Sequence, residues 1–317
     1  MHTVRGLYAP LPPLAAPVVA LGAFDGVHRG HQRILGTART WAAEMGGESV
    51  ALTFATLPRA VVGRGGALCI TSLPHRLVLL ERCGIDVAVV LPFDERVASI
   101  PAEGFVRDVL LGWLGARRIV LGRDATFGRG ARGDLAVLRR LEARGVLEVR
   151  SPPPVYHDGE VVSSSAIREA IAEGDLDQAA ALLGRPYSLL GTVEPGAGRG
   201  RSLGFPTANL DLHHEAFPPD GVYATVAYVD GRSHPSLTYI GRRPTFEPDA
   251  SPIVEVHVIG LQAELYGREL EVEFIQRLRG DARFHSPQAL VEQMRADRQA
   301  ALAAYAAARD GCGPTPH

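Results

Sequence analysis

The sequence predicts an α/β domain, a parallel sheet with helices on both faces in a Rossmann-like arrangement, followed by an antiparallel β-barrel with a C-terminal helix. The length of 317 residues exceeds the usual size of one domain. Strand-like and helix-like segments alternate in the first part, as they do in parallel sheets. Short β-branched segments separated by Gly and Pro turns follow, as in barrels. We place the boundary at the Gly184-Arg185-Pro186 break, which gives domains over residues 1–184 and 185–317.

The individual elements follow from the period of the apolar residues. In the first domain we expect strands at Val18–Leu21, Ser49–Phe54, Asp86–Leu91 and Arg118–Leu121. Between them we expect helices at His31–Met45, Pro74–Cys83 and Glu103–Leu114. In the second domain we expect strands at Gly191–Val193, Gly221–Val229, Ser236–Ile240, Ile253–Ile259 and Glu269–Phe274, and a last helix at Pro287–Ala308.

Composition narrows the class of protein. Hydrophobic residues make up 46% and charged residues 21% of the chain, which is typical of a globular protein with a sizeable core. The formal net charge of −2 gives no electrostatic case for a nucleic-acid partner. Three cysteines without metal-ligand spacing argue for a reducing compartment. Because no run approaches the roughly 18 apolar residues that span a bilayer, we expect a cytoplasmic protein with no membrane partner.

The first predicted strand runs directly into a glycine-rich loop and a helix, with the sequence Gly22-Ala23-Phe24-Asp25-Gly26-Val27-His28-Arg29-Gly30-His31. Glycines let a backbone approach a ligand closely, and a helix N-terminus offers free N–H groups to phosphate. His28 and His31 add donors, and a protonated imidazole would offset charge that builds on an α-phosphate during nucleotidyl transfer. Taken alone, two histidines are as often ordinary surface residues. The strand–loop–helix context favours the functional interpretation.

A second polar cluster, Ser163-Ser164-Ser165 with Arg168, precedes and opens a predicted helix at Ala166–Ala172. Its hydroxyls, its arginine and the N–H groups of the helix would suit the phosphates that leave as pyrophosphate. The simpler alternative is that the serines only cap the helix.

These two motifs together resemble nucleotidyltransferases with the His-x-Gly-His signature and, more narrowly, the N-terminal half of bifunctional prokaryotic FAD synthetases. The segments Gly122–Gly128 and Gly174–Pro186 extend the resemblance. It implies that the histidines and serines handle ATP, together with Gly22, Phe24, Asp25, Gly30 and Arg168. It also implies that Asp124 and Phe127 hold the flavin. The sequence departs from the family at Phe54-Ala55-Thr56-Leu57-Pro58, which lacks the usual Pro-His pair, and at Ala125, where the family has an aromatic residue.

The second half opens with another glycine-rich loop, which supplies the candidate phosphate-binding residues Gly196, Gly198, Arg201 and Gly204. A loop of this kind after a strand can present backbone N–H groups to a nucleotide, although a plain turn is the commoner meaning. Thr207 and Asn209 follow, and on an extended strand they point to the same face. A hydroxyl and an amide oxygen are hard ligands suited to Mg²⁺.

The segment Phe205-Pro206-Thr207-Ala208-Asn209 closely resembles the riboflavin kinase signature. Later segments agree with that family in order: Gly221–Tyr223, Ile240–Phe246, Val254–His257, Leu265–Gly267 and Leu278–Phe284. The resemblance implies Mg²⁺ on Thr207 and Asn209, Glu255 as the general base, and Arg279 near the flavin. Without the motif, Glu255 would read as a solvent-facing strand residue.

The sequence therefore predicts a bifunctional enzyme that converts riboflavin and ATP to FMN and ADP, then FMN and ATP to FAD and pyrophosphate. Its partners would be the small molecules riboflavin, FMN and ATP. The main alternative is a riboflavin kinase whose impaired first domain serves as a scaffold, because of the residues after Phe54 and at Ala125. A flavin-binding sensor and an adenylyltransferase for another substrate are further alternatives. The oligomeric state is left open.

Overall fold

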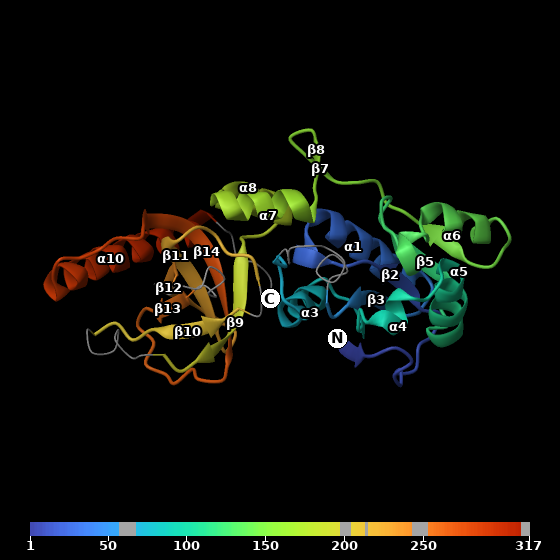
Figure 1. Cartoon of the computed structure of the whole chain (residues 1–317), viewed down its shortest axis with the longest axis horizontal. Coiled ribbons are helices and arrows are strands. Elements are labelled where there is room, and N and C mark those ends of the chain that lie inside the picture. The colour runs from blue at the N-terminus through green and yellow to red at the C-terminus, as the bar shows by residue number, and fades with distance from the viewer. Residues whose placement is uncertain (57–67, 197–203, 213–214, 243–252, 312–317) are drawn as a thin grey trace. The chain divides into compact units, whose positions relative to one another are not determined.

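The computed structural model describes residues 1–56, 68–196, 204–212, 215–242 and 253–311. The chain divides into two compact units, Met1–Ala166 and Ile167–His317. The first, the sheet unit, is built on a parallel sheet, and the second, the barrel unit, on a closed antiparallel barrel, as predicted (Figure 1).

The sheet has six strands in the order β1-β4-β3-β2-β5-β6, and every neighbouring pair is parallel. The central strands are continuous apolar runs because both of their faces are covered. The bounds are β1 His2–Arg5, β2 Val18–Leu21, β3 Ser49–Phe54, β4 Val87–Leu91, β5 Arg118–Leu121 and β6 Glu148–Arg150. A separate two-stranded ribbon pairs β7 Tyr156–His157 with β8 Glu160–Val161.

The helices cover both faces of the sheet, and successive strand residues feed two separate cores. Val18 and Ala20 pack with helices α1 and α3, whereas Val19 and Leu21 pack with η2 and α6. The helix bounds in this unit are η1 Asp25–Val27, α1 Arg29–Glu44, α3 Leu73–Arg82, α4 Glu95–Ala98, α5 Ala102–Gly104, η2 Phe105–Trp113, η3 Arg129–Ala131 and α6 Leu135–Glu142. The predicted helix at Glu103–Leu114 corresponds to α5 and η2, and η2 is a π-helix.

The strand order reverses direction beside β2. From β2 the chain moves outward through β3 and β4, and it returns to add β5 on the other side of β2. Leu21 and Leu121 are register partners, so the loops that begin at Gly22 and Gly122 leave the sheet side by side. Open parallel sheets bind ligands at this kind of switch point, beyond the carboxyl ends of the strands.

The barrel closes in the order β10-β13-β12-β11-β14-β9, and its pairs are antiparallel. Its interior holds a hydroxyl cluster in which Thr225 contacts Ser236 and Thr238 at 2.8 and 2.9 Å. On the outer face, Val222 and Leu237 pack against Ala301 of α10. The bounds are β9 Ser188–Glu194, β10 Ala208–Asp211, β11 Gly221–Val229, β12 Arg232–Gly241, β13 Ile253–Val258, β14 Glu269–Gly280 and α10 Pro287–Gly311.

Two helices join the halves of the sequence, α7 Ser164–Glu173 and α8 Leu176–Leu183. The compact units divide within α7, earlier than the predicted boundary at residue 184. One reason is local packing, since a Cβ at Gly174 would lie 3.2 Å from Pro219 of the barrel unit. The functional domain boundary itself stays a prediction.

Candidate active sites

The loop after β2 is an unusual turn that Asp25 holds in place. Phe24 and Val27 adopt left-handed backbone angles, with φ of 51° and 40°, which non-glycine residues rarely do. The Asp25 side chain is buried, and its Oδ1 accepts hydrogen bonds from the backbone N–H groups of Ile70 at 2.8 Å and Thr71 at 3.2 Å. The structure therefore gives the Asp25 carboxylate a positioning role, with these two N–H groups as its partners.

The two predicted catalytic histidines meet at the start of α1. His28 is the N-cap residue, and its Nδ1 accepts a hydrogen bond from the His31 N–H at 3.3 Å. The two rings stack with centroids 3.6 Å apart. A Cβ at Gly30 would lie 3.1 Å from the His28 ring, so a glycine at this position avoids a close contact with the ring. Nδ1 of His31 is buried and has no hydrogen-bond partner in the described part of the chain.

The charge state of His31 depends on its surroundings. Burial, followed by the charges of His28 and Arg76, holds the pKa of His31 well below its usual value of 6.5. The lowered pKa makes His31 neutral near pH 7, whereas the protonated imidazole facing the α-phosphate, considered from the sequence, stays a prediction. A neutral ring still carries one N–H donor.

Arg76 is a further candidate site residue because its charge acts on His31, and the motifs did not reveal it. It lies on α3, is almost fully buried, and donates from Nη1 to the Phe54 carbonyl at 2.8 Å and to Thr53 Oγ1 at 3.3 Å. It therefore places a cation beside the end of β3. The available signal was its spacing, because Arg76 lies three and four residues before the buried Leu79 and Leu80, on the apolar face of the helix.

The serines of the cluster differ in their contacts, and helix capping, the simpler of the two sequence-based interpretations, applies to one of them. Ser163 Oγ accepts a hydrogen bond from the Ala166 N–H at 3.3 Å, so the capping alternative describes Ser163. Ser164 Oγ donates to the Asp25 carbonyl at 3.0 Å and so joins the start of α7 to the loop after β2. Ser165 and Arg168 follow on α7, and their phosphate-binding roles stay predictions.

The predicted aromatic contacts mostly build the fold. The Phe24 ring is fully buried and meets the His31 ring edge to face at 5.4 Å, so it supports that histidine. The Phe127 ring lies in the core beside Phe105, with centroids 5.7 Å apart. Asp124 is exposed in the loop after β5, at the switch point. Of the two predicted flavin-binding residues, Asp124 is exposed to solvent and Phe127 is not. Flavin binding stays a prediction for both.

In the barrel unit, the predicted magnesium ligands and the predicted base come together. Asn209 and Glu255 are register partners on β10 and β13. Thr207 Oγ1 donates to Glu255 Oε2 at 3.4 Å. A Cβ at Gly196 would collide with the Asn209 amide, which explains a glycine at this point of the loop. Hydroxyl, amide and carboxylate oxygens thus share one small region, and such a set fits a hard divalent cation.

His257, which the motif analysis did not assign a role, positions the segment before Thr207. Its Nδ1 lies 2.8 Å from the Pro206 carbonyl, and its ring meets Phe205 edge to face at 5.4 Å. Burial is the main cause that lowers its pKa from 6.5, so the ring is neutral near pH 7. A cavity of about 460 Å³ lies next to this segment, lined by Pro206, Thr207, Ala208, Val256, Leu265 and Tyr266 among others.

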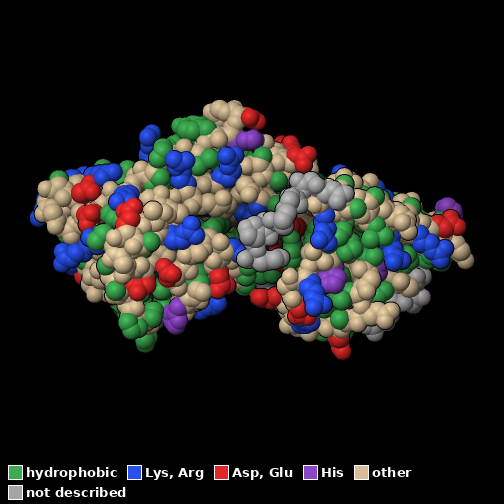
Figure 2. Space-filling model, turned by 180° about the vertical axis from the view of Figure 1, so that it is seen from behind, with side chains coloured by type: hydrophobic (Ala, Val, Ile, Leu, Met, Phe, Trp, Pro, Cys, Tyr) green, Lys and Arg blue, Asp and Glu red, His purple; other side chains and the backbone are tan. Residues whose placement is uncertain are grey.

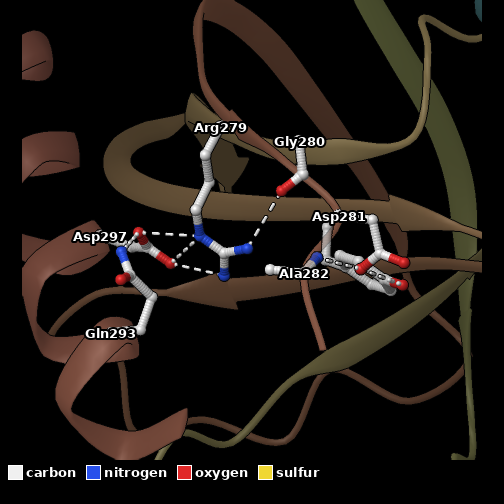
Figure 3. Close-up of polar contacts among 7 residues, drawn as sticks. Arg279, Gly280, Asp281, Ala282, Gln293 and Asp297 are labelled. Carbon is white, nitrogen blue, oxygen red and sulfur yellow. Dashed lines mark hydrogen bonds and ion pairs between the residues drawn. The ribbon is translucent and has the colours of Figure 1, made fainter. Parts of the chain in front are cut away.

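One row of side chains crosses the outer face of the barrel. Glu255 on β13 is the register partner of Tyr239 on β12. Tyr239 is in turn the register partner of Val222 on β11, and Val222 is the register partner of Arg279 on β14. Register partners point to the same face of a sheet, so Arg279 shares a face with the proposed base. Its guanidinium forms an ion pair with Asp297 of α10, with Nη2 and Oδ2 2.9 Å apart (Figure 3).

Some features fall outside these two clusters. Gly198 and Arg201 lie outside the described residues, and Gly204, the first described residue after them, is exposed.

The described residues contain no group of three His, Cys, Asp or Glu side chains that could hold a metal ion. In the same part of the chain, no helix combines the length and apolarity needed to cross a membrane. Figure 2 shows basic and acidic side chains interspersed on the visible face of each unit.

Comparison with known proteins agrees with this division of sites. The FAD synthetase family model matches residues 13–166, and the riboflavin kinase family model matches residues 183–305. The bifunctional riboflavin kinase/FMN adenylyltransferase of Pseudomonas fluorescens is 38% identical over the whole of both chains. That of Bacillus subtilis is 35% identical over 91% of this chain and 92% of its own.

Among solved structures, one described as a macrolide-efflux protein from Streptococcus pneumoniae superposes with a TM-score of 0.81. It is 30% identical and covers 95% of this chain and 99% of its own. Both family models and the relatives that match along the full length place the chain, as the motifs predicted, in the family of bifunctional riboflavin kinases/FMN adenylyltransferases.

Proposed function

We propose that this enzyme phosphorylates riboflavin in its barrel unit, with Glu255 as the general base. The contact that supports this most directly is the hydrogen bond from Thr207 to Glu255, with Asn209 opposite in register. Glu255 would take the proton from the ribityl 5′-hydroxyl as the oxygen attacks the γ-phosphate of ATP, and ADP would leave. The bond formed is from oxygen to phosphorus, and the bond broken joins the γ-phosphate to ADP.

Mg²⁺ fits the oxygen atoms beside Glu255, and Thr207 and Asn209 are the residues that would hold it. Bound there, the ion would supply charge neutralisation on the β- and γ-phosphates of ATP. The loop at Gly196, which packs against the Asn209 amide, would lie next to those phosphates. The neighbouring cavity, with Val256 and Leu265 in its wall, has the apolar lining that a planar adenine base requires.

The sheet unit would perform the second reaction at the switch point beside β2. The phosphate of FMN would attack the α-phosphate of ATP, and pyrophosphate would leave. His28 and neutral His31 would donate hydrogen bonds to the charge that develops on the α-phosphate, together with the N–H groups at the start of α1. The buried and unpaired Nδ1 of His31 supports a ligand at this position. The loop at Asp124 would contact the flavin from the adjacent strand.

A cytoplasmic location belongs to the same proposal. It is supported by the small and odd number of cysteines in the sequence, Cys69, Cys83 and Cys312, which lie far apart along the chain.

A single assay tests both activities. Purified full-length protein is incubated with riboflavin, ATP and Mg²⁺, and FMN and FAD are separated by chromatography over time. FMN followed by FAD is the expected result. Accumulation of FMN with no FAD, even with excess ATP and reduced flavin, would leave the kinase and support the scaffold alternative. Omitting Mg²⁺ is expected to abolish both products, and a reaction that persists in chelator would contradict the metal assignment.

A further inference from the structure

Arg279 is held at the end of β14 by a carboxylate from another part of the fold. Asp297 of α10 accepts hydrogen bonds from Arg279 Nε at 3.0 Å and Nη2 at 2.9 Å, and from Gln293 Nε2 at 2.8 Å. Arg279 Nη1 donates to the Gly280 carbonyl at 3.1 Å. Figure 3 shows the guanidinium between the Asp297 carboxylate and the Gly280 carbonyl. Two-point pairing fixes the plane of a guanidinium as well as its position.

The ion pair is more than the means by which α10 attaches to the barrel. The attachment already has an apolar contact, because Ala301 and Ala304 pack on Val222, Ala224 and Leu237. Those alanines lie four and seven residues after Asp297, on the same face of the helix. Asp297 is about 5% exposed. Compared with apolar residues of similar size, a buried ion pair adds little net stability, and such a pair can serve to restrict its members to one arrangement.

The segment that Arg279 anchors connects to the proposed kinase site. Asp281 lies two residues after Arg279, and its Oδ1 accepts hydrogen bonds from the Ala282 N–H at 3.0 Å and from the Tyr239 hydroxyl at 3.4 Å. Tyr239 is the register partner of Glu255. Burial, and then the charge of Asp281, raise the pKa of the Tyr239 hydroxyl, so it remains a donor at neutral pH. A series of contacts thus connects α10 with β12, the strand that pairs with the strand of Glu255. Its members are Asp297, Arg279, Asp281 and Tyr239.

The spacing of the row suits riboflavin. Three strand separations lie between Glu255 and Arg279, about 14 Å along the sheet. Because α10 covers Val222, a substrate whose 5′-hydroxyl reaches Glu255 would have to span this distance beside the helix to bring the edge of its ring to Arg279. The Arg279 guanidinium also lies over the Phe284 ring, 5.5 Å from its centroid. Its remaining N–H groups and this aromatic ring are the groups that recognise a planar heterocycle with acceptor atoms on its edge.

We propose that Asp297 is a positioning residue for the kinase reaction, which orients Arg279 and the 279–282 segment toward the ring of riboflavin. The inference rests on the proposed kinase function. It adds a residue from the C-terminal helix to the recognition of the flavin, through Arg279 and without direct contact with the reacting atoms.

The test is steady-state kinetics of the full-length Asp297→Asn variant, with riboflavin and ATP varied separately. We expect the KM for riboflavin to rise about tenfold, the factor that corresponds to about 1.4 kcal/mol. The kcat and the KM for ATP should stay within about twofold, because Glu255 and Thr207 are untouched. Riboflavin affinity, measured by quenching of its fluorescence without ATP, should fall by a similar factor. Asp297→Glu, which keeps the charge, should recover most of the affinity that Asp297→Ala loses.

Two controls separate positioning from a loss of structure. Glu292→Gln makes the same chemical change at an exposed carboxylate of the same helix and should leave both KM values unchanged. FAD formation from added FMN should also be unchanged in every variant. In an Arg279→Gln background, Asp297→Asn should have little further effect, because the two residues act as one unit.

An unchanged KM for riboflavin in Asp297→Asn would overturn the inference. A full tenfold effect of Asp297→Asn in the Arg279→Gln background would also overturn it. So would an Asp297→Asn variant in which the kcat, the affinity for ATP and the rate of FAD synthesis fall as much as the affinity for riboflavin. If wild-type protein makes no FMN at all, the proposed kinase function itself fails. That result is distinct from wild-type turnover with an indifferent Asp297→Asn.

Discussion

The two units assemble their candidate sites in different ways. In the sheet unit, the centre of the candidate site is the loop after β2, and four of its residues are close in sequence: Gly22, Asp25, His28 and His31. In the barrel unit, the site is a row of side chains across strands, and Asn209, Glu255, Tyr239 and Arg279 come from four of them. The first site depends on the course of one loop, and the second depends on strand register.

This difference determines how each site fails. A one-residue slip in a strand moves every side chain to the opposite face, so a slip of β13 would remove Glu255 from Asn209. The sheet-unit loop has no such register. It depends instead on buried hydrogen bonds that the Ile70 and Thr71 N–H groups donate to Asp25, and these hold a turn containing two non-glycine residues with positive φ. Substitutions should therefore separate the two activities cleanly.

The largest expected effect is that of Glu255→Gln on the kinase. Removing a general base typically costs about 10²–10⁴-fold in rate, and FMN formation should fall by that factor while riboflavin binding survives. FAD formation from added FMN should be unchanged, since the sheet unit does not use this residue. Product analysis by chromatography, starting from riboflavin or from FMN, measures both. Near-normal FMN turnover in this variant would contradict the role of Glu255.

The converse substitution is in the sheet unit. His28→Ala or His31→Ala should lower FAD formation by about 10²–10³-fold, because each removes a donor to the charge on the α-phosphate. FMN formation from riboflavin is the internal control and should not change. FAD synthesis that is indifferent to His28→Ala would show that the stacked pair has only a structural role.

Three Gly→Ala substitutions sharpen the comparison at smaller magnitude. Gly196→Ala places a methyl group against the Asn209 amide and should lower kinase kcat/KM for ATP about tenfold. Gly30→Ala brings a methyl within 3.1 Å of the His28 ring and should lower FAD synthesis a few-fold. Gly36→Ala is the matched control, because a Cβ there meets nothing within 4 Å, and it should raise stability by about 0.5–1 kcal/mol through helix propensity. Equal effects of all three on both activities would contradict independent sites.

The smallest effect is on the pH dependence of stability. The pKa of His31 is lowered in the folded state, so the unfolded chain binds more protons below pH 6.5. The contribution of His31 to the free energy of unfolding is therefore complete above pH 6.5 and is lost as the pH falls toward the lowered pKa. His31→Asn should reduce the drop in stability between pH 7.5 and 5.5.

The fluorescence of tryptophan provides the measurement. Trp41 and Trp113, the two tryptophans of the chain, both belong to the sheet unit. Urea unfolding followed by this signal therefore reports the unit that contains His31. An identical pH dependence in wild type and His31→Asn would mean that the folded and unfolded pKa values do not differ.

Much of the architecture could be predicted from the sequence, because it depends on the pattern of residues that are close together in the chain. Apolar runs such as Val18–Leu21 and the strand–loop–helix at Gly22–His31 predicted the parallel sheet and the place of its first site. Alternation along the strand put Thr207 and Asn209 on one face, and they lie with Glu255. The π-helix of η2, the additional helix α6 and the extension of β14 to Gly280 were not predicted, since element ends and variants depend on tertiary packing.

What only the tertiary structure decided is which distant side chains meet and how each is used. Arg76 and His257 were not predicted as site residues because their partners, Phe54 and Pro206, lie 22 and 51 residues away. Asp25 matched a motif, but its carboxylate is buried and accepts hydrogen bonds from the Ile70 and Thr71 N–H groups. Arg279 also matched a motif, yet the carboxylate that fixes it comes from α10, 18 residues further along the chain. Burial and long-range pairing set the charge and orientation of a side chain, and local sequence carries no record of either.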